Sequence, residues 1–187
     1  MLTTGDGQIA DDLRLLTNHG MRPRYHHQEI GINSRLDSMQ AAILQIKIQK
    51  LAAWSKGRIE NARRYNDLFR EFEMDGDVLL PTQQFESSQH VWNQYTIRVP
   101  NGWRDNVRQQ MADMNVGTEI YYPIPVHLQV CFNHLTIERG SLPETELASS
   151  EVLSLPIFPE LREAEQRYVV GCLSKALQTQ AVELRPA

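Results

Sequence analysis

The sequence predicts an α/β protein in which helices pack on one side of a small, mainly antiparallel sheet. Three segments, 7–18, 34–54 and 162–178, repeat their apolar residues at the spacing of an amphipathic helix. One segment, Val91–Val99, alternates between two faces as a half-buried strand does. Because the predicted strands are few, we expect an α+β layer rather than a complete parallel sheet.

The composition limits the classes of protein to which this chain can belong. Its 187 residues are 41% hydrophobic, which is enough for one core or for one domain with a fragment of a second. The net charge is −4 and no basic stripe is present, so we expect no nucleic-acid binding. No apolar run approaches the roughly 18 residues of a membrane span, and the N-terminus lacks a signal-peptide pattern. We therefore expect a cytoplasmic protein without membrane contact.

The cysteines and adjacent histidines indicate no metal site. Cys131 and Cys172 lie far apart and match no metal-binding or redox spacing. We predict that both are reduced core residues, because free cysteine is among the most buried residue types, and this agrees with a reducing compartment. His26 and His27 point in different directions, and no acidic or cysteine partner stands at a useful spacing.

The strongest helical pattern begins at Ser34, after a short predicted helix over 7–18 and a loop over 21–32. Ser34 and Asp37 resemble a capping box, with Asp in place of the usual Glu. A helix that is apolar on more than one side, as this one is, is predicted to be buried between two bodies. Gly57 marks an expected break, after which a more polar helix continues. The main apolar stripe consists of Leu36, Met39, Ile43 and Ile46.

The second half of the chain contains the predicted sheet. Val91–Val99 is one strand and Val116–Tyr122 is its partner, with a helix over 103–115 between them. Prolines end the second strand, because proline cannot donate to a ladder. A short helix over 145–153 and the final helix over 162–178 follow. The inward face of the final helix is predicted to carry Ala164, Tyr168, Val169, Cys172, Leu173, Ala176 and Leu177.

Asn33, Ser34 and Arg35 stand where the long helix is predicted to begin. Helix N-termini offer free N–H groups and a positive dipole end, so phosphates bind there readily. An amide and a guanidinium beside that end would suit a phosphate or a carboxylate. The alternative is structural: Asn33 and Ser34 cap the helix and Arg35 is solvated.

Several motifs occur in the order found in one enzyme family. EIGINSRLDSMQAAIL (29–44) is similar to E-I-G-x-N-x-R-L-D-x-x-Q-A-A, and TNHG (17–20) with RYHH (24–27) precedes it as in that family. GTEIYYPIPVHLQ (117–129) resembles G-I-x-Y-P-x-P-x-H-x-Q, and LSLPIFPEL (153–161) resembles a late L-S-L-P-x-x-P-x-L. These motifs span nearly the entire chain, which therefore resembles the C-terminal half of the DegT/DnrJ/EryC1/StrS aminotransferases.

The resemblance implies a fold, a cofactor and a reaction. The family consists of fold-type I enzymes that use pyridoxal 5'-phosphate (PLP) to move an amino group, here expected from glutamate, to a nucleotide-linked keto-sugar. Residues 1–32 would be a remnant of the large PLP-binding domain, and residues 33–187 the linking helix and the C-terminal small domain. The expected partners are the nucleotide-sugar and either a second copy, as in the family homodimer, or a chain that supplies the large domain.

The resemblance also implies site residues. Asn33 matches the Asn that reaches across the dimer to the PLP phosphate, and Arg35 matches an Arg that contacts the sugar in uronate-type enzymes. Tyr122 matches a sugar-contacting Tyr, whereas Tyr121 replaces the usual His. Since a phenol with a pKa of about 10 can only hydrogen-bond a carboxylate, this change argues against an acidic sugar. His127 matches the family His, with either a substrate-binding or a structural role.

The family's catalytic lysine has no counterpart here. It forms a Schiff base with PLP and moves the proton, and it would fall on the order of ten residues before Met1, so no catalytic residue is assigned to this chain. Lys47, Lys50, Lys56 and Lys175 are predicted to be solvated. We expect the chain to be inactive alone.

Two non-catalytic roles remain as alternatives. The chain could be a dimerisation fragment that pairs with a full-length subunit, or a regulator, as some family members were first described. The regulatory reading is the weaker, because nothing basic or helix-turn-helix-like is present.

Overall fold

The structure is a computed structural model that describes residues 2–74, 76–82 and 90–183, with side chains up to residue 180. The chain divides into two compact units, Met1–Lys50 and Leu51–Ala187. Each unit has its own local architecture and is described by itself. Among the described residues, no helix is both long enough and apolar enough to cross a membrane.

The first unit contains two helices. Helix α1, Gly7–Leu16, begins after Asp6, whose carboxylate accepts the backbone N–H groups of Gln8 and Ile9. Helix α2, Ser38–Ile48, begins after Asp37, which accepts the N–H of Met39 at 2.8 Å. The predicted start at Ser34 is therefore wrong by four residues, because Asp37 is the cap and the backbone N–H of Ser34 donates to Thr17 instead.

The apolar residues of α2 are not buried in this unit. No residue of α2 is buried, and the predicted stripe is more than half exposed along its length. The prediction that this helix lies between two bodies is therefore not met by the described residues. The exposed apolar side chains of this stretch are Leu36, Met39, Ile43, Leu44, Ile46 and Ile48.

Helix α3, Leu51–Glu71, opens the second unit. The expected continuous helix over 34–54 is wrong, because α2 ends at Ile48 and a turn at Gln49 and Lys50 separates it from α3. The expected break at Gly57 is also wrong, because Gly57 lies inside α3. The inner face of α3 carries Asn61, Ala62, Tyr65, Leu68 and Phe69.

A two-stranded antiparallel sheet lies at the centre of the second unit. Strand β1, Tyr95–Arg98, pairs with β2, Val152–Leu155, in the register Tyr95↔Leu155 and Ile97↔Leu153. The predicted partner strand Val116–Tyr122 is wrong: that segment adds only an isolated bridge between Glu119 and Ser154. The predicted helix over 145–153 ends earlier, because its last two residues belong to β2.

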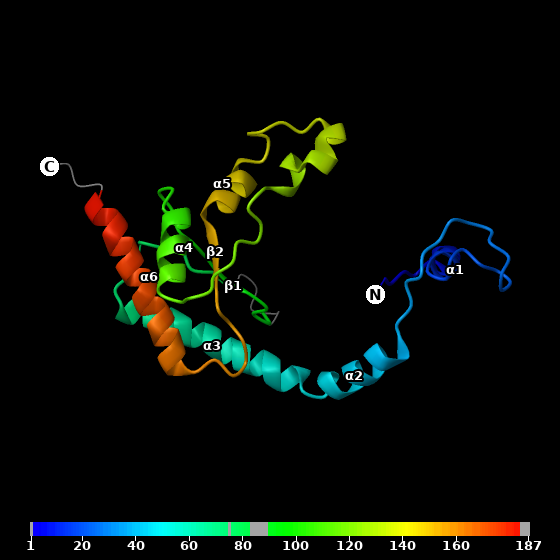
Figure 1. Cartoon of the computed structure of the whole chain (residues 1–187), viewed down its shortest axis with the longest axis horizontal. Helices are drawn as coiled ribbons and strands as arrows, with labels where there is room; N and C mark the ends of the chain where they lie inside the picture. Colours follow the sequence, from blue (N-terminus) through cyan, green and yellow to red (C-terminus); the bar gives the residue numbers. More distant parts are fainter. Residues whose placement is uncertain (1, 75, 83–89, 184–187) are drawn as a thin grey trace. The chain divides into compact units, whose positions relative to one another are not determined.

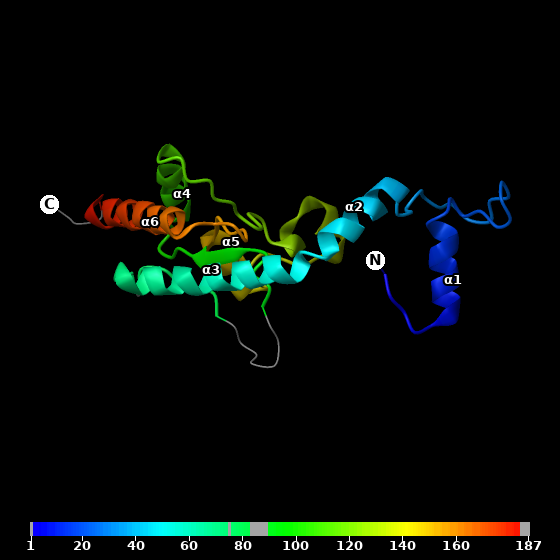
Figure 2. The ribbon, with the colours of Figure 1, turned by 90° about the horizontal axis from the view of Figure 1, so that it is seen from below.

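Helices cover the sheet and close the core. Helix α4, Arg104–Asp113, and helix α6, Glu163–Glu183, pack against each other, and α6 also packs on α3, as both views show (Figure 1, Figure 2). The described core draws its largest buried side chains from these helices and both strands. These side chains are Tyr65, Phe69, Tyr95, Ile97, Val99, Val107, Met111, Leu153, Val170 and Leu173.

Three residues predicted to lie in the core are exposed: two positions on α6 and one cysteine. Ala164 and Tyr168 are exposed, because the inward stripe of α6 includes Gln166 and Val170 instead. Cys172 is buried as predicted, but Cys131 is exposed. Cys131 lies in the short helix η2, Val130–Leu135, which contributes no buried residue. Figure 1 shows this stretch projecting from the layer, beyond helix α5, Pro143–Glu151.

Replacing Tyr65 with Phe should destabilise the second unit. The fully buried Tyr65 hydroxyl donates to the carbonyl of Pro156 at 2.8 Å, and burial raises the pKa of this phenol far above its usual value. Loss of one partner of a buried hydrogen bond costs about 1–3 kcal/mol. We expect a loss of that size in the free energy of unfolding, measured by urea titration.

Tyr168→Phe is the matched control. Its hydroxyl also donates to a backbone carbonyl, that of Met114 at 2.9 Å, but the side chain is 56% exposed. Water can replace that bond, so this substitution should change the free energy of unfolding by under about 0.5 kcal/mol. Equal losses in the two variants would show that burial of the Tyr65 hydroxyl is not the cause.

Candidate functional site

A closed loop over residues 18–33 presents the first predicted site residue. Asn18 and Asn33 form an antiparallel bridge at its base. The N–H of His19 donates to the carbonyl of Ile32 at 3.0 Å, and that of Ser34 donates to Thr17 at 3.0 Å. These backbone bonds fix Asn33 beside the C-terminal end of α1.

Two glycines make this closure possible. Gly20 has a φ of 65°, and a Cβ on it would stand 1.9 Å from the carbonyl oxygen of Glu29. A Cβ on Gly31 would stand 2.3 Å from the backbone nitrogen of Gly20. Neither position has room for a side chain. The N-H-G and E-I-G motifs therefore have a structural reason: they let the two ends of the loop touch.

The structure places Asn33 and Arg35 in contact with each other. Arg35 Nε donates to Asn33 Oδ1 at 3.1 Å, and both residues are exposed. Because α2 begins at Ser38, the two side chains stand on an extended segment rather than at the helix N-terminus, so the helix-dipole reasoning does not apply to them. The bond engages the amide oxygen of Asn33 and leaves its NH₂ group to donate to a ligand.

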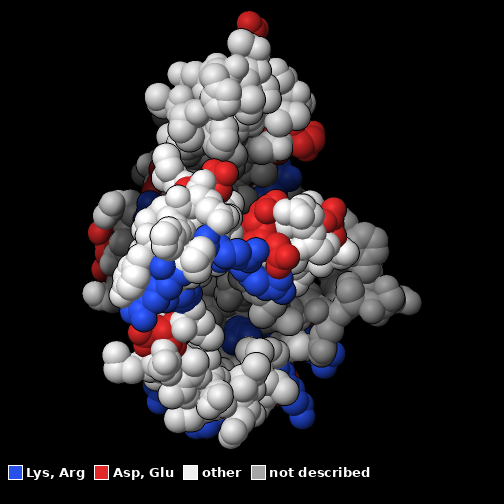
Figure 3. Space-filling view, turned by 90° about the vertical axis from the view of Figure 1, so that its right-hand side faces the viewer, with Lys and Arg blue, Asp and Glu red and all other residues white. Residues whose placement is uncertain are grey.

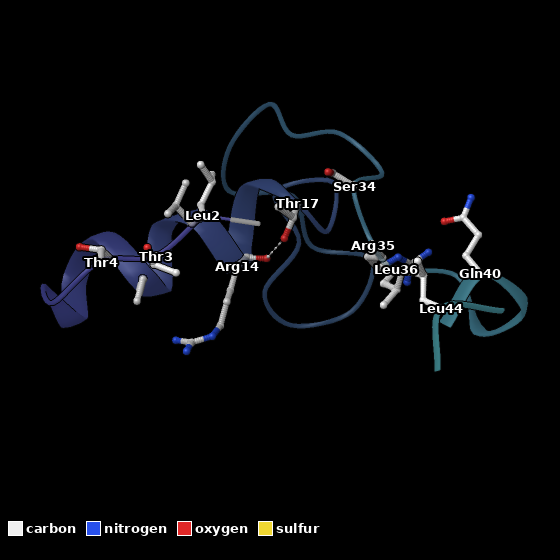
Figure 4. A pocket seen from close by; sticks show the side chains of 12 residues that line it. Leu2, Thr3, Thr4, Arg14, Thr17, Ser34, Arg35, Leu36, Gln40 and Leu44 are labelled. Atoms are coloured by element: carbon white, nitrogen blue, oxygen red, sulfur yellow. Dashed lines mark hydrogen bonds between the residues drawn. The ribbon is translucent and has the colours of Figure 1, made fainter. Parts of the chain in front are cut away.

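A hollow of about 900 Å³ lies next to this pair within the first unit. Figure 4 shows it between the N-terminal residues, α1 and the segment from Ser34 to Leu44. Arg14 and Arg35 contribute guanidinium groups, and hydroxyls come from Thr3, Thr4, Thr17 and Ser34. Such donors suit a phosphate. The residues present therefore fit the phosphate end of a cofactor such as PLP.

Tyr121 and Tyr122 form an exposed aromatic pair in the second unit. Their rings meet edge to face with centroids 6.3 Å apart. Both rings line a mainly apolar hollow with Ile124, Pro125 and residues of α5. Ser149 Oγ fixes the backbone here, at 3.1 Å from the carbonyl oxygens of both Tyr122 and Pro123. Aromatic rings with phenolic hydroxyls can stack on a sugar face and bond its hydroxyls.

The side chain of His127 is almost fully buried and lines neither of the hollows that Tyr121 lines. It belongs to the short helix η1, Val126–Leu128, and only 7% of its side chain is exposed. Its Nε2 stands 3.2 Å from Oε1 of Glu146 on α5, and the same oxygen accepts the N–H of Gly140 at 2.7 Å. This geometry favours the structural role for His127.

The environment of Glu146 favours its charged form. Burial acts to raise the pKa of this carboxyl, but hydrogen bonds from the Gly140 N–H, from His127 and from the Leu142 N–H together outweigh it. The pKa therefore lies below its usual value of 4.5. Glu146 thus joins η1, the turn at Gly140 and α5 through one carboxylate.

The predicted site residues fall into two groups. Asn33 and Arg35 belong to the unit Met1–Lys50, while Tyr121, Tyr122 and His127 belong to Leu51–Ala187. Sequence reasoning missed Arg14 and the threonine hydroxyls of the first hollow, and the role of Glu146. The threonines carried no motif signal, whereas Arg14 in the last turn of α1 could have been noticed. Glu146 is separated from His127 by 19 residues, so only the fold reveals their contact.

The four lysines lie on the surface, as predicted. Lys47, Lys50, Lys56 and Lys175 are all exposed, on or beside helices. On the face shown in Figure 3, basic side chains lie among acidic ones. Within the described part of the chain, no three His, Cys, Asp or Glu residues gather in a way that could hold a metal ion.

Comparison with known proteins adds relatives of stated activity. The chain is 42% identical over 170 residues to the pleiotropic regulatory protein of Geobacillus stearothermophilus, covering 91% of this chain and 45% of that protein. It is 37% identical over 177 residues to the UDP-N-acetyl-3-dehydro-alpha-D-glucosamine 3-aminotransferase of Acidithiobacillus ferrooxidans, covering 95% and 46%. The chain therefore spans about half the length of the curated relatives that it matches.

Solved structures match this chain over nearly its whole length and over about half of their own. The S. venezuelae protein DesV, in complex with a ketimine intermediate, matches with a TM-score of 0.80 and 34% identity over 94% of this chain and 46% of that chain. The Bacillus subtilis protein ntda with bound cofactor PMP matches with a TM-score of 0.76 and 28% identity over 94% and 41%. A profile of the DegT/DnrJ/EryC1/StrS aminotransferases matches residues 1–174. This chain therefore belongs to the DegT/DnrJ/EryC1/StrS aminotransferase family, whose sugar transaminases use PLP or PMP.

Proposed function

We propose that this chain is part of a cytoplasmic PLP-dependent aminotransferase that acts on nucleotide-linked keto-sugars, with glutamate as the amino donor. The product would be an amino sugar for cell-surface polysaccharides or related compounds. The observation that carries the proposal is the group of guanidinium and hydroxyl donors, Arg35 among them, that line the hollow of the first unit, with Asn33 hydrogen-bonded to Arg35. The stated activity of the A. ferrooxidans relative supports it.

Two parts of a larger enzyme would meet in this chain. Residues 1–32 are proposed as a remnant of the large PLP-binding domain, and residues 33–187 as the linking helix and the small domain. The exposed apolar side chains of α2 support this division, because a contiguous apolar face normally packs against another surface. In the complete enzyme that surface would come from the large domain or from the second subunit.

Asn33 would hold the cofactor phosphate of the neighbouring subunit. Its NH₂ group is free to donate, and Arg35 Nε holds its oxygen, which sets the direction of the amide. PLP, when bound, supplies the electron sink that allows the amino group to move. Arg35 still has its terminal guanidinium nitrogens to bond the sugar, since only Nε engages Asn33.

Tyr121 and Tyr122, which belong to the second unit, would also bind the sugar. The exposed edge-to-face pair offers the face of a ring and two hydroxyls. His127 would act through the backbone, because its ring turns toward Glu146 and supports the loop that carries the tyrosines. The proton-transferring lysine would come from the large domain or from a partner chain.

A non-catalytic role is the second candidate. The G. stearothermophilus relative, 42% identical, is a pleiotropic regulatory protein. A fragment with an exposed apolar helix could pair with a full-length subunit without performing the reaction. This candidate predicts binding without amino transfer.

The proposal predicts amino transfer once the large domain is restored. To build a full-length subunit, the N-terminal part of the A. ferrooxidans relative, up to the point where its match to this chain begins, would be joined to the start of this chain. With glutamate and a UDP-linked 3-keto sugar, it should form 2-oxoglutarate and the amino sugar in equal amounts, measured by mass spectrometry. A subunit that folds and dimerises but transfers no amino group would contradict the proposal and favour the regulatory candidate.

Substitutions at Asn33 and Arg35 in that subunit should separate cofactor from substrate. Loss of one hydrogen bond to an anion costs about 1–3 kcal/mol, so Asn33→Ala should weaken PLP binding by roughly ten- to a hundredfold. Arg35→Ala should weaken PLP binding less than Asn33→Ala does, because Arg35 only orients the amide, and it should raise the KM for the sugar. PLP binding is measured by fluorescence titration, and the KM by initial rates.

A heterodimer tests whether Asn33 serves the neighbouring site. Asn33→Ala on one chain and loss of the lysine on the other should leave one intact site and about half the activity. Both changes on one chain should leave only an impaired site. The reverse order of activities would show that Asn33 acts within its own subunit, and equal activities would show that it does not contribute.

Glu146→Gln should loosen the loop below the tyrosines in a pH-dependent way. Because the folded pKa of Glu146 is lowered, its stabilisation is present above the usual pKa of 4.5 and is lost as the pH falls through the folded value. At pH near 7, segment 122–142 should exchange its amide hydrogens faster in the variant. The thermal midpoints of variant and wild type should converge in acid.

Glu144→Gln, on the same helix, provides the control. It removes the same charge from an exposed residue in the first turn of α5. Its exchange rates over 122–142 should stay close to those of the wild type. An equal effect of both substitutions would refute the specific role of Glu146.

A further inference from the structure

A further hollow of the second unit lies at the edge of the sheet, beside β2. Its volume is about 390 Å³, and its polar lining comes from three separate segments. Tyr121 lines both hollows, so a ligand against this ring can reach either. The polar residues that line it are Asn93, Gln94, Thr118, Glu119, Tyr121 and Ser154.

The backbone holds Glu119 firmly at this edge. Its N–H donates to the carbonyl of Ser154 at 3.1 Å, and the N–H of Ser154 donates back to Glu119 at 2.7 Å. Ile120 and Val116, on either side, are buried in the core. Glu119 therefore keeps its position on the border of β2, although its own side chain is half exposed.

Only part of the hydrogen-bonding capacity of the Glu119 carboxylate is used within the protein. Its Oε1 accepts the N–H of Ile120 at 3.0 Å and stands 3.3 Å from a terminal nitrogen of Arg108. The structure records no hydrogen bond to Oε2 from any residue that it describes. A carboxylate has about four lone-pair sites, so Glu119 can accept further bonds from a ligand.

The rest of the lining has the chemistry of hydroxyl recognition. Asn93, Gln94 and Thr118 make no side-chain hydrogen bond to any other described residue, whereas Ser154 Oγ is paired with Thr96. Amides and hydroxyls both donate and accept, as sugar hydroxyls do. Glu119 is the one charged side chain among the described residues that line this hollow.

We propose that this hollow receives the hydroxymethyl side of the substrate sugar and that Glu119 selects neutral sugars against uronates. The inference rests on the proposed function, because it takes a nucleotide-linked sugar as the ligand. A neutral sugar donates a hydroxyl to Oε2, whereas the carboxylate of a uronate meets a like charge. Specificity of this kind depends on the repulsive group as much as on the attractive contacts.

The neighbouring groups act in the same direction. Tyr121 offers a phenol, which can hydrogen-bond a carboxylate but cannot neutralise it. Arg108 is the nearest recorded cation, and its guanidinium is on α4 and contacts the side of Glu119 rather than lining the hollow. It therefore partly offsets the negative charge of Glu119 without cancelling it.

The test is binding by the 187-residue chain itself. The probes are UDP-N-acetylglucosamine and its counterpart that carries a carboxylate at C6, titrated by calorimetry. The wild-type chain should prefer the neutral probe by about tenfold, as expected for one like-charge contact at a protein surface. Glu119→Gln keeps the acceptor for the Ile120 N–H and should reduce this preference to about twofold, mainly by improving binding of the uronate.

Two further variants make the result specific. Arg108→Gln removes the neighbouring cation and should increase the preference for the neutral probe. Glu60→Gln removes the same charge from an exposed site on α3, outside the hollow, and should leave the preference unchanged. If Glu60→Gln and Glu119→Gln have equal effects, net charge rather than this site is responsible.

The remaining outcomes are decisive. A wild-type chain that binds both probes equally, or neither, overturns the proposal, as does a Glu119→Gln variant with an unchanged preference. Failure of the proposed function is distinguishable, because it would appear as absent amino transfer by the full-length subunit. A chain that discriminates through Glu119 would keep its sugar site even then.

Discussion

The pairing of β1 with β2 is the constraint on which the second unit depends. It joins residues that are more than fifty positions apart, and it places Tyr95, Ile97, Leu153 and Leu155 on one buried face. That face supplies the common surface for α3, α4 and α6. On the opposite face, Thr96 and Ser154 bond each other at 2.8 Å, and Ser154 in turn bonds the backbone of Glu119.

The position of the tyrosine pair follows from that pairing. Once Glu119 is attached to the edge of β2, the chain leaves the core at Ile120 and exposes the next two residues. Ser149 and Glu146 on α5 then hold the two ends of the segment from Tyr122 to Gly140 against that helix. The two tyrosines, the proposed sugar-binding residues, are thus exposed, while the groups that position them are buried or hydrogen-bonded. Such an arrangement lets a site contact a ligand without losing its geometry.

A buried polar network explains the late L-S-L-P motif. Asn61 Nδ2 donates to the carbonyl of Phe158 at 2.7 Å, and Arg64 donates to both Asn61 and Gln166. Tyr65 bonds the carbonyl of Pro156. The segment after β2 therefore satisfies its carbonyl groups on α3 before α6 begins. The motif has a structural role here, because it directs the chain from the sheet to the final helix.

The sequence by itself determined the family and most of the helical segments, because apolar spacing and short motifs are local properties, and it supplied the candidate site residues. It predicted β1 correctly near Tyr95, and α1 within two residues. It failed on the partner strand, since the choice between Val116–Tyr122 and β2 depends on packing over long separations. Likewise, the pattern predicted Ser34 as the helix cap, but in the folded chain its N–H donates to Thr17 as part of the loop closure. The contacts of His127 with Glu146, and of Arg108 with Glu119, were decided only by tertiary structure, because their partners come from different elements.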